Sequence, residues 1–248
     1  MTTITTSAAG LVEGEVDVPA PDRPLPAYRA MPSGGRVLPT ILVVQEIFGV
    51  HPWIRDVCRR FARLGYYAIA PDLYVRQGDP SKIADTQTLI RAIVAKVPDE
   101  QVLRDLDATV AYAQSSGDAD TSRLGITGFC WGGRIVWMYA AHEPRVKAAV
   151  AWYGPVARVY HEGDRTPRDV VQNVRAAVLG LYGGADPGIP VDSTRTIGDA
   201  MRRAGKTVEI VTYPDAPHAF FADYRPSYRK QPSDDAWQRA VDWFSRYL

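Results

Sequence analysis

Cys130, one of two cysteines, lies in a glycine-rich stretch, GFCWGG at 128–133, between an apolar run and a helical pattern. A Gly-x-nucleophile-x-Gly turn strains the backbone of its central residue, so small residues must flank it, and Gly128 and Gly132 have that spacing. The turn raises the central side chain above a sheet and aims the first N–H groups of the next helix toward it. The stretch therefore favours a cysteine nucleophile beside an oxyanion hole. A strand-to-helix turn that holds a cysteine by chance remains the alternative.

An acid and a histidine follow this turn, each just past a predicted strand. Asp186 lies in GGADPG after the run 176–182, and His218 lies in PDAPH after the run 208–213. The order nucleophile, acid, histidine is that of a catalytic triad carried by neighbouring strand ends. Asp186 has a second interpretation as a turn former, because aspartate caps its own backbone.

A further loop, EIFGVH at 46–51, follows the apolar run that ends at Gln45. In this architecture a second oxyanion donor comes from such a loop, and we expect it to be the N–H of Ile47, acting with that of Trp131. Glu46 would then stand near Cys130, although a solvated loop carboxylate is the alternative. His51 fits either a place in the pocket or a helix-capping or surface role.

The segments around these residues alternate between strand and helix patterns. A continuous apolar run, typical of a strand covered on both faces, occurs at 38–45, and further strands are expected at 66–70, 123–127, 146–152, 176–182 and 208–213. Helical spacing is found at 53–65, within 81–96, and at 99–115, 131–142, 192–204 and 234–247. This order predicts an α/β fold with a doubly wound, mostly parallel sheet flanked by helices. Residues 11–31 are expected to add an antiparallel edge hairpin or meander.

No internal repeat, low-complexity tract or Gly/Ser linker marks a boundary, so residues 1–248 are expected to form a single domain. Residues 1–10 are expected to be disordered or loosely ordered. Residues 154–175 form a long connection that is predicted to be irregular. Cys58 falls on the apolar stripe of the helix at 53–65, where a free cysteine acts as a small hydrophobic residue and fills the core.

Composition argues against several functional classes. With 46% hydrophobic and 23% charged residues and a net charge of +1, the chain has ordinary globular values, and its spread charge does not favour nucleic acid or membrane as a partner. It lacks a run of roughly 18 apolar residues for a membrane helix. The first ten residues lack the basic start and apolar stretch of a secretory signal, so a cytoplasmic location is expected. Two cysteines in such a chain are more often free than paired.

Five motifs, in order, resemble those of the dienelactone hydrolases, or carboxymethylenebutenolidases: VQEIFGV (44–50), PDLY (71–74), GFCWGG (128–133), GGAD (183–186) and PHAF (217–220). The resemblance covers residues 38–246. It implies an α/β-hydrolase fold and a triad of Cys130, His218 and Asp186 that acts without metal or organic cofactor. It also implies that Glu46 interacts with the cysteine until substrate binding releases it and the thiolate forms.

The resemblance has one departure that concerns the substrate. Family members that process dienelactone carry arginines for its carboxylate, one of them four residues after the histidine, where this chain has Ala222. Arg225 and Arg76 are the basic side chains nearest to the expected site. Phe48 and Phe220 are expected to contact the substrate in an apolar pocket, to which other aromatic residues could add their rings: Trp131, Trp152, Tyr153 and Phe221.

These observations favour a cysteine-dependent carboxylic ester hydrolase of lactones or small activated (enol) esters, which works through an acyl-cysteine. Its partner would be the small-molecule substrate, and the protein a monomer or small homo-oligomer. A thioesterase or acyl transferase would use the same acyl-cysteine with another acceptor, so product analysis with added thiol or amine separates the two. A noncatalytic ligand-binding protein on the same scaffold is a third hypothesis, which the intact triad disfavours.

Overall fold

The computed structural model describes residues 4–248, which divide into two compact units. The N-terminal unit comprises residues 6–124 and 159–164, and the C-terminal unit comprises residues 4–5, 125–158 and 165–248. The strand β5 (Ala119–Phe129) begins in the first unit and ends in the second. The single domain expected for residues 1–248 stays a prediction, and residues 1–3 of the expected loose terminus lie outside the described residues.

The strands of the N-terminal unit are β1 (Leu11–Val18), β2 (Leu25–Pro32), β3 (Leu38–Val44) and β4 (Tyr67–Pro71), in the spatial order β1-β2-β4-β3. β1 and β2 pair antiparallel from Leu11↔Pro32 to Val18↔Leu25, which confirms the predicted edge hairpin. β2 is also antiparallel to β4, whereas β3 and β4 are parallel. The sheet is therefore mixed, and its antiparallel part is confined to the N-terminal edge.

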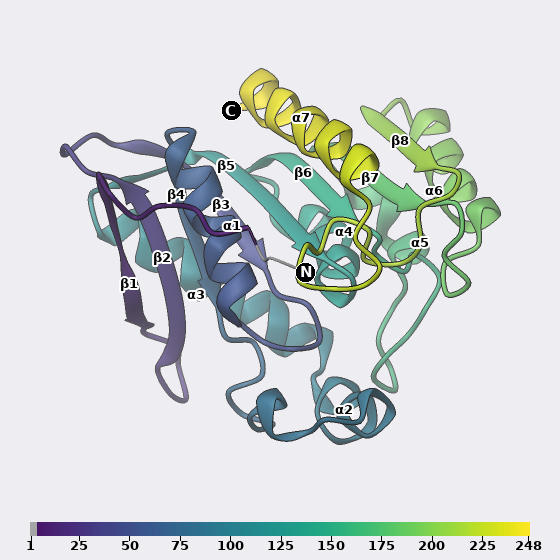
Figure 1. Ribbon diagram of the computed structural model, residues 1–248, viewed down its shortest axis with the longest axis horizontal. Coiled ribbons are helices and arrows are strands. Elements are labelled where there is room, and N and C mark those ends of the chain that lie inside the picture. Colours follow the sequence, from purple (N-terminus) through teal and green to yellow (C-terminus); the bar gives the residue numbers. More distant parts are fainter. Residues whose placement is uncertain (1–3) are drawn as a thin grey trace. The chain divides into compact units, whose positions relative to one another are not determined.

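Helices cover both faces of these strands, with α1 (Pro52–Arg63) on one side and α3 (Asp99–Ser115) on the other (Figure 1). The predicted stripe of α1 is buried, and Cys58 within it has no exposed surface. The short α2 (Thr86–Ala92) begins where the Asp85 side chain accepts the Thr88 N–H. The 3-10 turns Pro80–Lys82 and Val94–Lys96 flank α2 and take up the rest of the helical pattern at 81–96.

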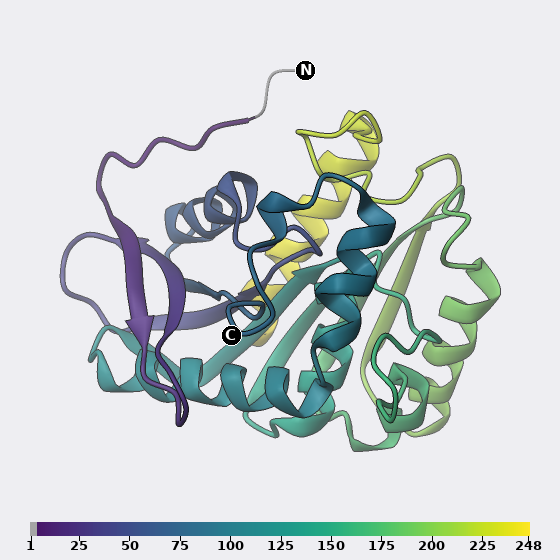
Figure 2. The same cartoon turned by 90° about the horizontal axis from the view of Figure 1, so that it is seen from below.

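The C-terminal unit holds the end of β5 and three parallel strands, β6 (Val146–Trp152), β7 (Ala177–Gly183) and β8 (Val208–Tyr213). Its long helices are α4 (Trp131–His142), α6 (Val191–Arg203) and α7 (Lys230–Tyr247). α7 lies on one face of these strands, and α4 and α6 lie on the other (Figure 2). The predicted alternation of strands and helices is thus confirmed.

Two details differ from the prediction. The connection 154–175 is not wholly irregular, since it contains α5 (Pro167–Val170) and a 3-10 turn at Val171–Asn173. A capping box formed by Thr166 and Asp169 starts α5. α7 begins at Lys230 rather than at residue 234. Pro232 is tolerated there because a proline in the first helical turn lacks only an N–H that would have no intrahelical acceptor.

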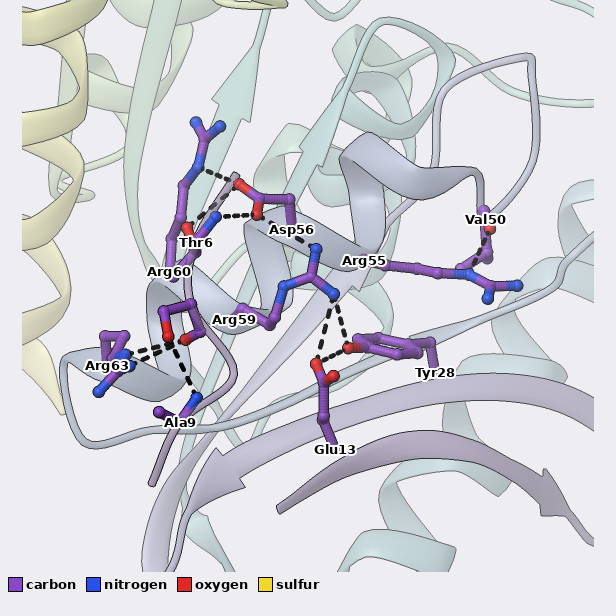
Figure 3. A network of polar contacts seen from close by, with 11 residues as sticks. Thr6, Ala9, Glu13, Tyr28, Val50, Arg55, Asp56, Arg59, Arg60 and Arg63 are labelled. Atoms are coloured by element: carbon purple, nitrogen blue, oxygen red, sulfur yellow. Dashed lines mark hydrogen bonds and ion pairs between the residues drawn. The ribbon is translucent and has the colours of Figure 1, made fainter. Parts of the chain in front are cut away.

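The start of the described chain is tied to α1 through Asp56, which is 2% exposed. One carboxylate oxygen of Asp56 accepts the Thr6 N–H at 2.6 Å and an Arg59 donor at 3.2 Å. The other accepts Arg60 Nε at 2.7 Å and the Thr6 hydroxyl at 3.2 Å (Figure 3). Four donors thus compensate the buried carboxylate for its lost hydration.

The same cluster links α1 to the edge hairpin. Arg59 donates to the Tyr28 hydroxyl at 3.0 Å and to Glu13 Oε2 at 3.3 Å (Figure 3). Arg63 donates through Nε and an η nitrogen to the Ser7 carbonyl oxygen at 3.2 and 2.9 Å. Residues 6 and 7 are therefore hydrogen-bonded to α1, although residues 4–10 form no helix or strand.

We expect Asp56→Ala to lower the free energy of unfolding by about 2 kcal/mol, the usual cost of hydrogen bonds lost at a charged group. For a chain of this length, that corresponds to a melting temperature lower by about 4–8 °C. Thermal unfolding followed by circular dichroism measures the change. Asp234→Ala, which removes only an exposed pair with Lys230, is the matched control and should leave the melting temperature unchanged. Equal melting temperatures for the two variants would contradict the structural role of Asp56.

Candidate active site

Cys130 stands between the last residue of β5 and the first residue of α4, with φ 56° and ψ −117°. Positive φ is unfavourable for a side chain with a Cβ, and hydrogen bonds fix it here on both sides. The Cys130 N–H donates to the Trp152 carbonyl oxygen at 3.0 Å, and the Cys130 carbonyl oxygen accepts the Arg134 N–H at 3.2 Å. The thiol is partly exposed, so the turn presents it to a reactant.

Two glycines allow the chain to pass close under this turn. A Cβ on Gly133 would lie 2.5 Å from the Trp152 carbonyl oxygen, and one on Gly154 would lie 2.2 Å from the Gly133 carbonyl carbon. The first turn of α4 and the segment after β6 therefore touch backbone to backbone. The spacing of glycines in the sequence pointed to Gly128 and Gly132 but not to the contact between Gly133 and Gly154. The signal available was the Tyr-Gly-Pro sequence directly after a strand.

Asp186 and His218 meet because the turns after β7 and β8 are packed together. The Gly184 N–H donates to the Tyr213 carbonyl oxygen at 2.7 Å, and the Ala185 N–H donates to that of Ala216 at 3.1 Å. His218 Nδ1 then lies 2.6 Å from Asp186 Oδ2. Asp186 Oδ1 accepts the Gly188 N–H at 2.8 Å, so both carboxylate oxygens are engaged.

Cys130 and Asp186 both raise the pKa of His218. Burial of the imidazole lowers its pKa, but the charge of Cys130 and the hydrogen bonds to Asp186 and Cys130 raise it more, from 6.5 to about 10. The protonated ring is therefore the stable form at neutral pH.

The ring of His218 also has an aromatic neighbour. The Tyr153 ring meets it edge to face, with centroids 5.2 Å apart. Tyr153 has φ 38°, and its N–H donates to the Leu181 carbonyl oxygen at 2.8 Å. Directly after His218, Ala219 has φ 58°. From the sequence, Tyr153 was expected only as one of several aromatic residues of an apolar pocket. Its contact with His218 was not predicted, because positive φ at a tyrosine or an alanine leaves no sequence signal.

The other site residues predicted in the C-terminal unit differ in their burial and in the elements that carry them. Trp131 is the first residue of α4, where helix N–H groups point toward the N-terminus and carry partial positive charge. Phe220 has no exposed surface and packs between the rings of Tyr153 and Tyr213. Ala222 is also fully buried, and the Arg225 N–H donates to its carbonyl oxygen at 2.9 Å.

Four candidates belong to the N-terminal unit. Glu46 has no exposed surface and Ile47 has 7%, whereas Phe48 is partly exposed. They lie in a tight turn in which Glu46 and Gly49 form a β-bridge. The fourth, Arg76, is held by carboxylates: it donates to both oxygens of Asp22 at 2.6 Å and to those of Asp105 at 2.7 and 3.1 Å. A substrate carboxylate would have to compete with these two aspartates.

Other kinds of site were sought over the same residues. Across residues 4–248, no three His, Cys, Asp or Glu side chains gather in a group that could hold a metal ion. Within this range, no helix is both long and apolar enough to cross a membrane.

Similarity to known proteins covers nearly the whole chain. The sequence signature of the Dienelactone hydrolase family matches residues 25–248. The chain belongs to the dienelactone hydrolase family. A "Putative carboxymethylenebutenolidase" of Methylorubrum extorquens is 58% identical over 252 residues, which cover 99% of this chain and 85% of that protein. One of the same name from Escherichia coli is 50% identical over 253 residues, covering 99% and 91%.

A solved structure agrees with this assignment. The crystal structure titled "Putative Dienelactone Hydrolase" from Klebsiella pneumoniae has 51% sequence identity and a TM-score of 0.92, covering 96% of this chain and 99% of that one. The expected α/β-hydrolase fold is thereby confirmed. So is the expected enzyme class, because this family consists of hydrolases of lactone and ester substrates.

The pairing of His218 can be tested by imidazole NMR. Because its pKa is raised above 6.5, the protonated ring stabilises the folded state fully below pH 6.5, and this contribution is lost as pH rises through about 10. We expect the wild-type His218 signal to titrate near pH 10 and to move to lower pH in Cys130→Ala, which lacks the charge and hydrogen bond of the thiol. Cys58→Ala, at the buried cysteine, is the control and should leave the titration unchanged. A wild-type midpoint near 6.5 would contradict the pairing.

Proposed function

We propose that the protein hydrolyses lactones or small activated (enol) esters with Cys130 as nucleophile, His218 as base and acid, and Asp186 as the residue that orients His218. One observation carries the proposal: the partly exposed Cys130 thiol, on a strained turn, raises the pKa of a histidine that is itself bonded to a buried carboxylate. A cation beside a thiol favours the thiolate, which is the nucleophilic form. The side chains of His218 and Asp186 are 30% and 2% exposed, so the base remains accessible while its partner is buried.

In the first half of the proposed reaction, the Cys130 thiolate attacks the carbonyl carbon and the carbonyl π electrons move to oxygen. The tetrahedral oxyanion collapses, the carbon–oxygen bond to the leaving group breaks, and that oxygen takes a proton from the His218 imidazolium. In a lactone the leaving oxygen stays attached through the ring. In an enol ester the negative charge that develops on this oxygen is delocalised as in an enolate before the proton from His218 reaches it, which makes the bond easy to cleave.

In the second half, neutral His218 takes a proton from water as the water oxygen attacks the acyl-cysteine. The carbon–sulfur bond breaks, the thiolate is released, and the imidazolium forms again, so atoms and charges return to the starting state. We propose the N–H groups of Trp131 and Ile47 as donors to both oxyanions. The position of Trp131 at the start of α4 supports its part in this.

We further propose that Glu46 controls formation of the thiolate, as the family resemblance implies, by interacting with the thiol until substrate arrives. A carboxylate without solvent exposure, such as that of Glu46, changes its proton affinity strongly with its surroundings, which suits a proton-controlling role. For the substrate, Phe48, Phe220, Arg76 and Arg225 stay candidate contacts. With Ala222 at the family's arginine position and Arg76 bound to two aspartates, we propose that a substrate carboxylate is not required.

Replacing the nucleophile gives the direct test. We expect Cys130→Ala to lower kcat/KM for an unsubstituted aryl lactone and for an activated phenyl ester by at least about 1,000-fold, as removal of a triad nucleophile does elsewhere. Steady-state hydrolysis followed by absorbance measures this. Cys58→Ala is the matched control, since it removes the buried cysteine of α1 and should retain turnover. Unchanged hydrolysis in Cys130→Ala would refute the mechanism.

Thiol alkylation tests Glu46 separately. Burial raises the pKa of the Cys58 thiol, so iodoacetamide should label Cys130 selectively. We expect Glu46→Gln to shift the pH dependence of labelling to lower pH, because a neighbouring carboxylate disfavours the thiolate. Glu15→Gln, at an exposed glutamate of the same unit, controls for a general charge effect. Identical labelling profiles for wild type and Glu46→Gln would exclude the proposed role of Glu46 while leaving that of Cys130 intact.

A further inference from the structure

His51 contacts the carboxylate of Glu46 within the N-terminal unit. His51 Nε2 lies 3.3 Å from Glu46 Oε2, and the two side chains are 19% and 0% exposed. A carboxylate with no exposed surface needs charged or hydrogen-bonding partners to remain ionised. His51 supplies such a partner, either as imidazolium or as the neutral tautomer that carries its proton on Nε2.

The backbone between the two residues holds this pair in register. Gly49 has φ 78°, its N–H donates to the Glu46 carbonyl oxygen at 3.4 Å, and the two residues form a β-bridge. This φ favours a glycine, and a Cβ on Gly49 would also lie in tight contact with Pro80 Cγ, at 3.0 Å. The turn folds back and directs His51, the N-cap residue of α1, onto Glu46.

Two aromatic side chains fix the plane of the His51 ring. The Trp53 ring stacks on it with centroids 6.1 Å apart and an interplanar angle of 15°. The Phe48 ring meets it edge-on at 6.3 Å and 78°. His51 makes no side-chain hydrogen bond to cap α1, so its orientation toward Glu46 is not a by-product of capping. Packing against Trp53 and Phe48, together with the contact to Glu46, therefore sets the orientation of the ring.

The same ring forms part of the wall of a cavity of about 420 Å³ in this unit. The other charged side chains that line the cavity have partners of their own. Arg55 pairs with Glu15 at 2.7 Å, Asp79 accepts the Ser81 N–H at 2.9 Å, and Asp72 accepts the Tyr74 N–H at 2.9 Å. His51 therefore lies in a cavity wall whose other charged side chains are engaged by neighbouring groups.

We propose that His51 is a positioning residue for Glu46: it keeps the buried carboxylate ionised and oriented so that Glu46 holds the Cys130 thiol until substrate binds, takes up its proton as the thiolate forms, and returns that proton when product leaves. This rests on the function proposed above for Glu46. His51 takes no part in the bonds that form or break. Its contribution is made through Glu46 and disappears when residue 46 can no longer ionise.

The test is a double-mutant cycle with lactone hydrolysis and Cys130 alkylation as readouts. In the wild-type background, we expect His51→Leu to lower kcat about tenfold, as a displaced catalytic group does, with KM changed less than about twofold. His51→Gln, whose amide can donate to Glu46, should retain most of the activity.

In the Glu46→Gln background, His51→Leu should change kcat and the alkylation profile less than about twofold. An equal loss in both backgrounds would overturn the proposal, because His51 would then act on the fold and not through Glu46. If His51→Leu fails to fold, His51→Ala with added imidazole replaces it: recovery of kcat that depends on Glu46 supports the proposal, and no recovery contradicts it. Failure of the proposed function is seen separately, as unchanged turnover in Cys130→Ala or unchanged alkylation in Glu46→Gln.

Discussion

The strained backbone at Cys130 is the constraint on which the arrangement of the C-terminal unit depends. Among residues 4–248, the non-glycine residues with positive φ are Cys130, Tyr153 and Ala219, and each costs roughly 1–3 kcal/mol. All three lie at the proposed site. Backbone hydrogen bonds hold two of them: the Cys130 N–H donates to the Trp152 carbonyl oxygen, and the N–H of the next residue, Tyr153, donates to that of Leu181. The ends of β5, β6 and β7 thus lock one another, and the reactive side chains can be held where an unconstrained chain would not place them.

Because the backbone fixes these positions, the charged and polar groups of the site interact in a defined geometry. Asp186 is buried and accepts two hydrogen bonds, so its position is fixed. His218 is packed against Tyr153 on one side and remains partly open to solvent. The buried acid therefore orients the base, while the open side of the base can meet a leaving group or a water molecule. A histidine buried as deeply as Asp186 could hold a proton but could not deliver it to a substrate.

Much of this was predictable from sequence, for reasons that also explain the misses. The apolar runs and glycine stops located the strands and α4, and the order of Cys130, Asp186 and His218 after three of those runs identified the proposed triad. Patterns of this kind report on burial and on turns. They do not report on close backbone approach or unusual φ, so Gly154 and Tyr153 were missed. They also give no account of side-chain pairing: Arg76 was chosen for its charge, whereas in the folded chain Asp22 and Asp105 bind its guanidinium.

Two observations argue against recognition of a substrate carboxylate: the ion pairs of Arg76 and the alanine at position 222. A substrate carboxylate is bound well by a guanidinium whose donors it can approach in parallel, and here the donors of Arg76 are aligned on Asp22 and Asp105. Ala222 is fully buried, so the site of the family's arginine is filled by packing. Under the proposed function, selection among substrates would then rest on features other than a carboxylate, such as the reactivity of the bond that is cleaved. An enzyme that does not recognise a substrate carboxylate cannot use that charge to limit its reactivity. Under the proposed function, the reactivity of the thiolate would therefore be limited by controlling when the thiolate forms. The buried Glu46, held by His51, is a group whose protonation could supply that restraint.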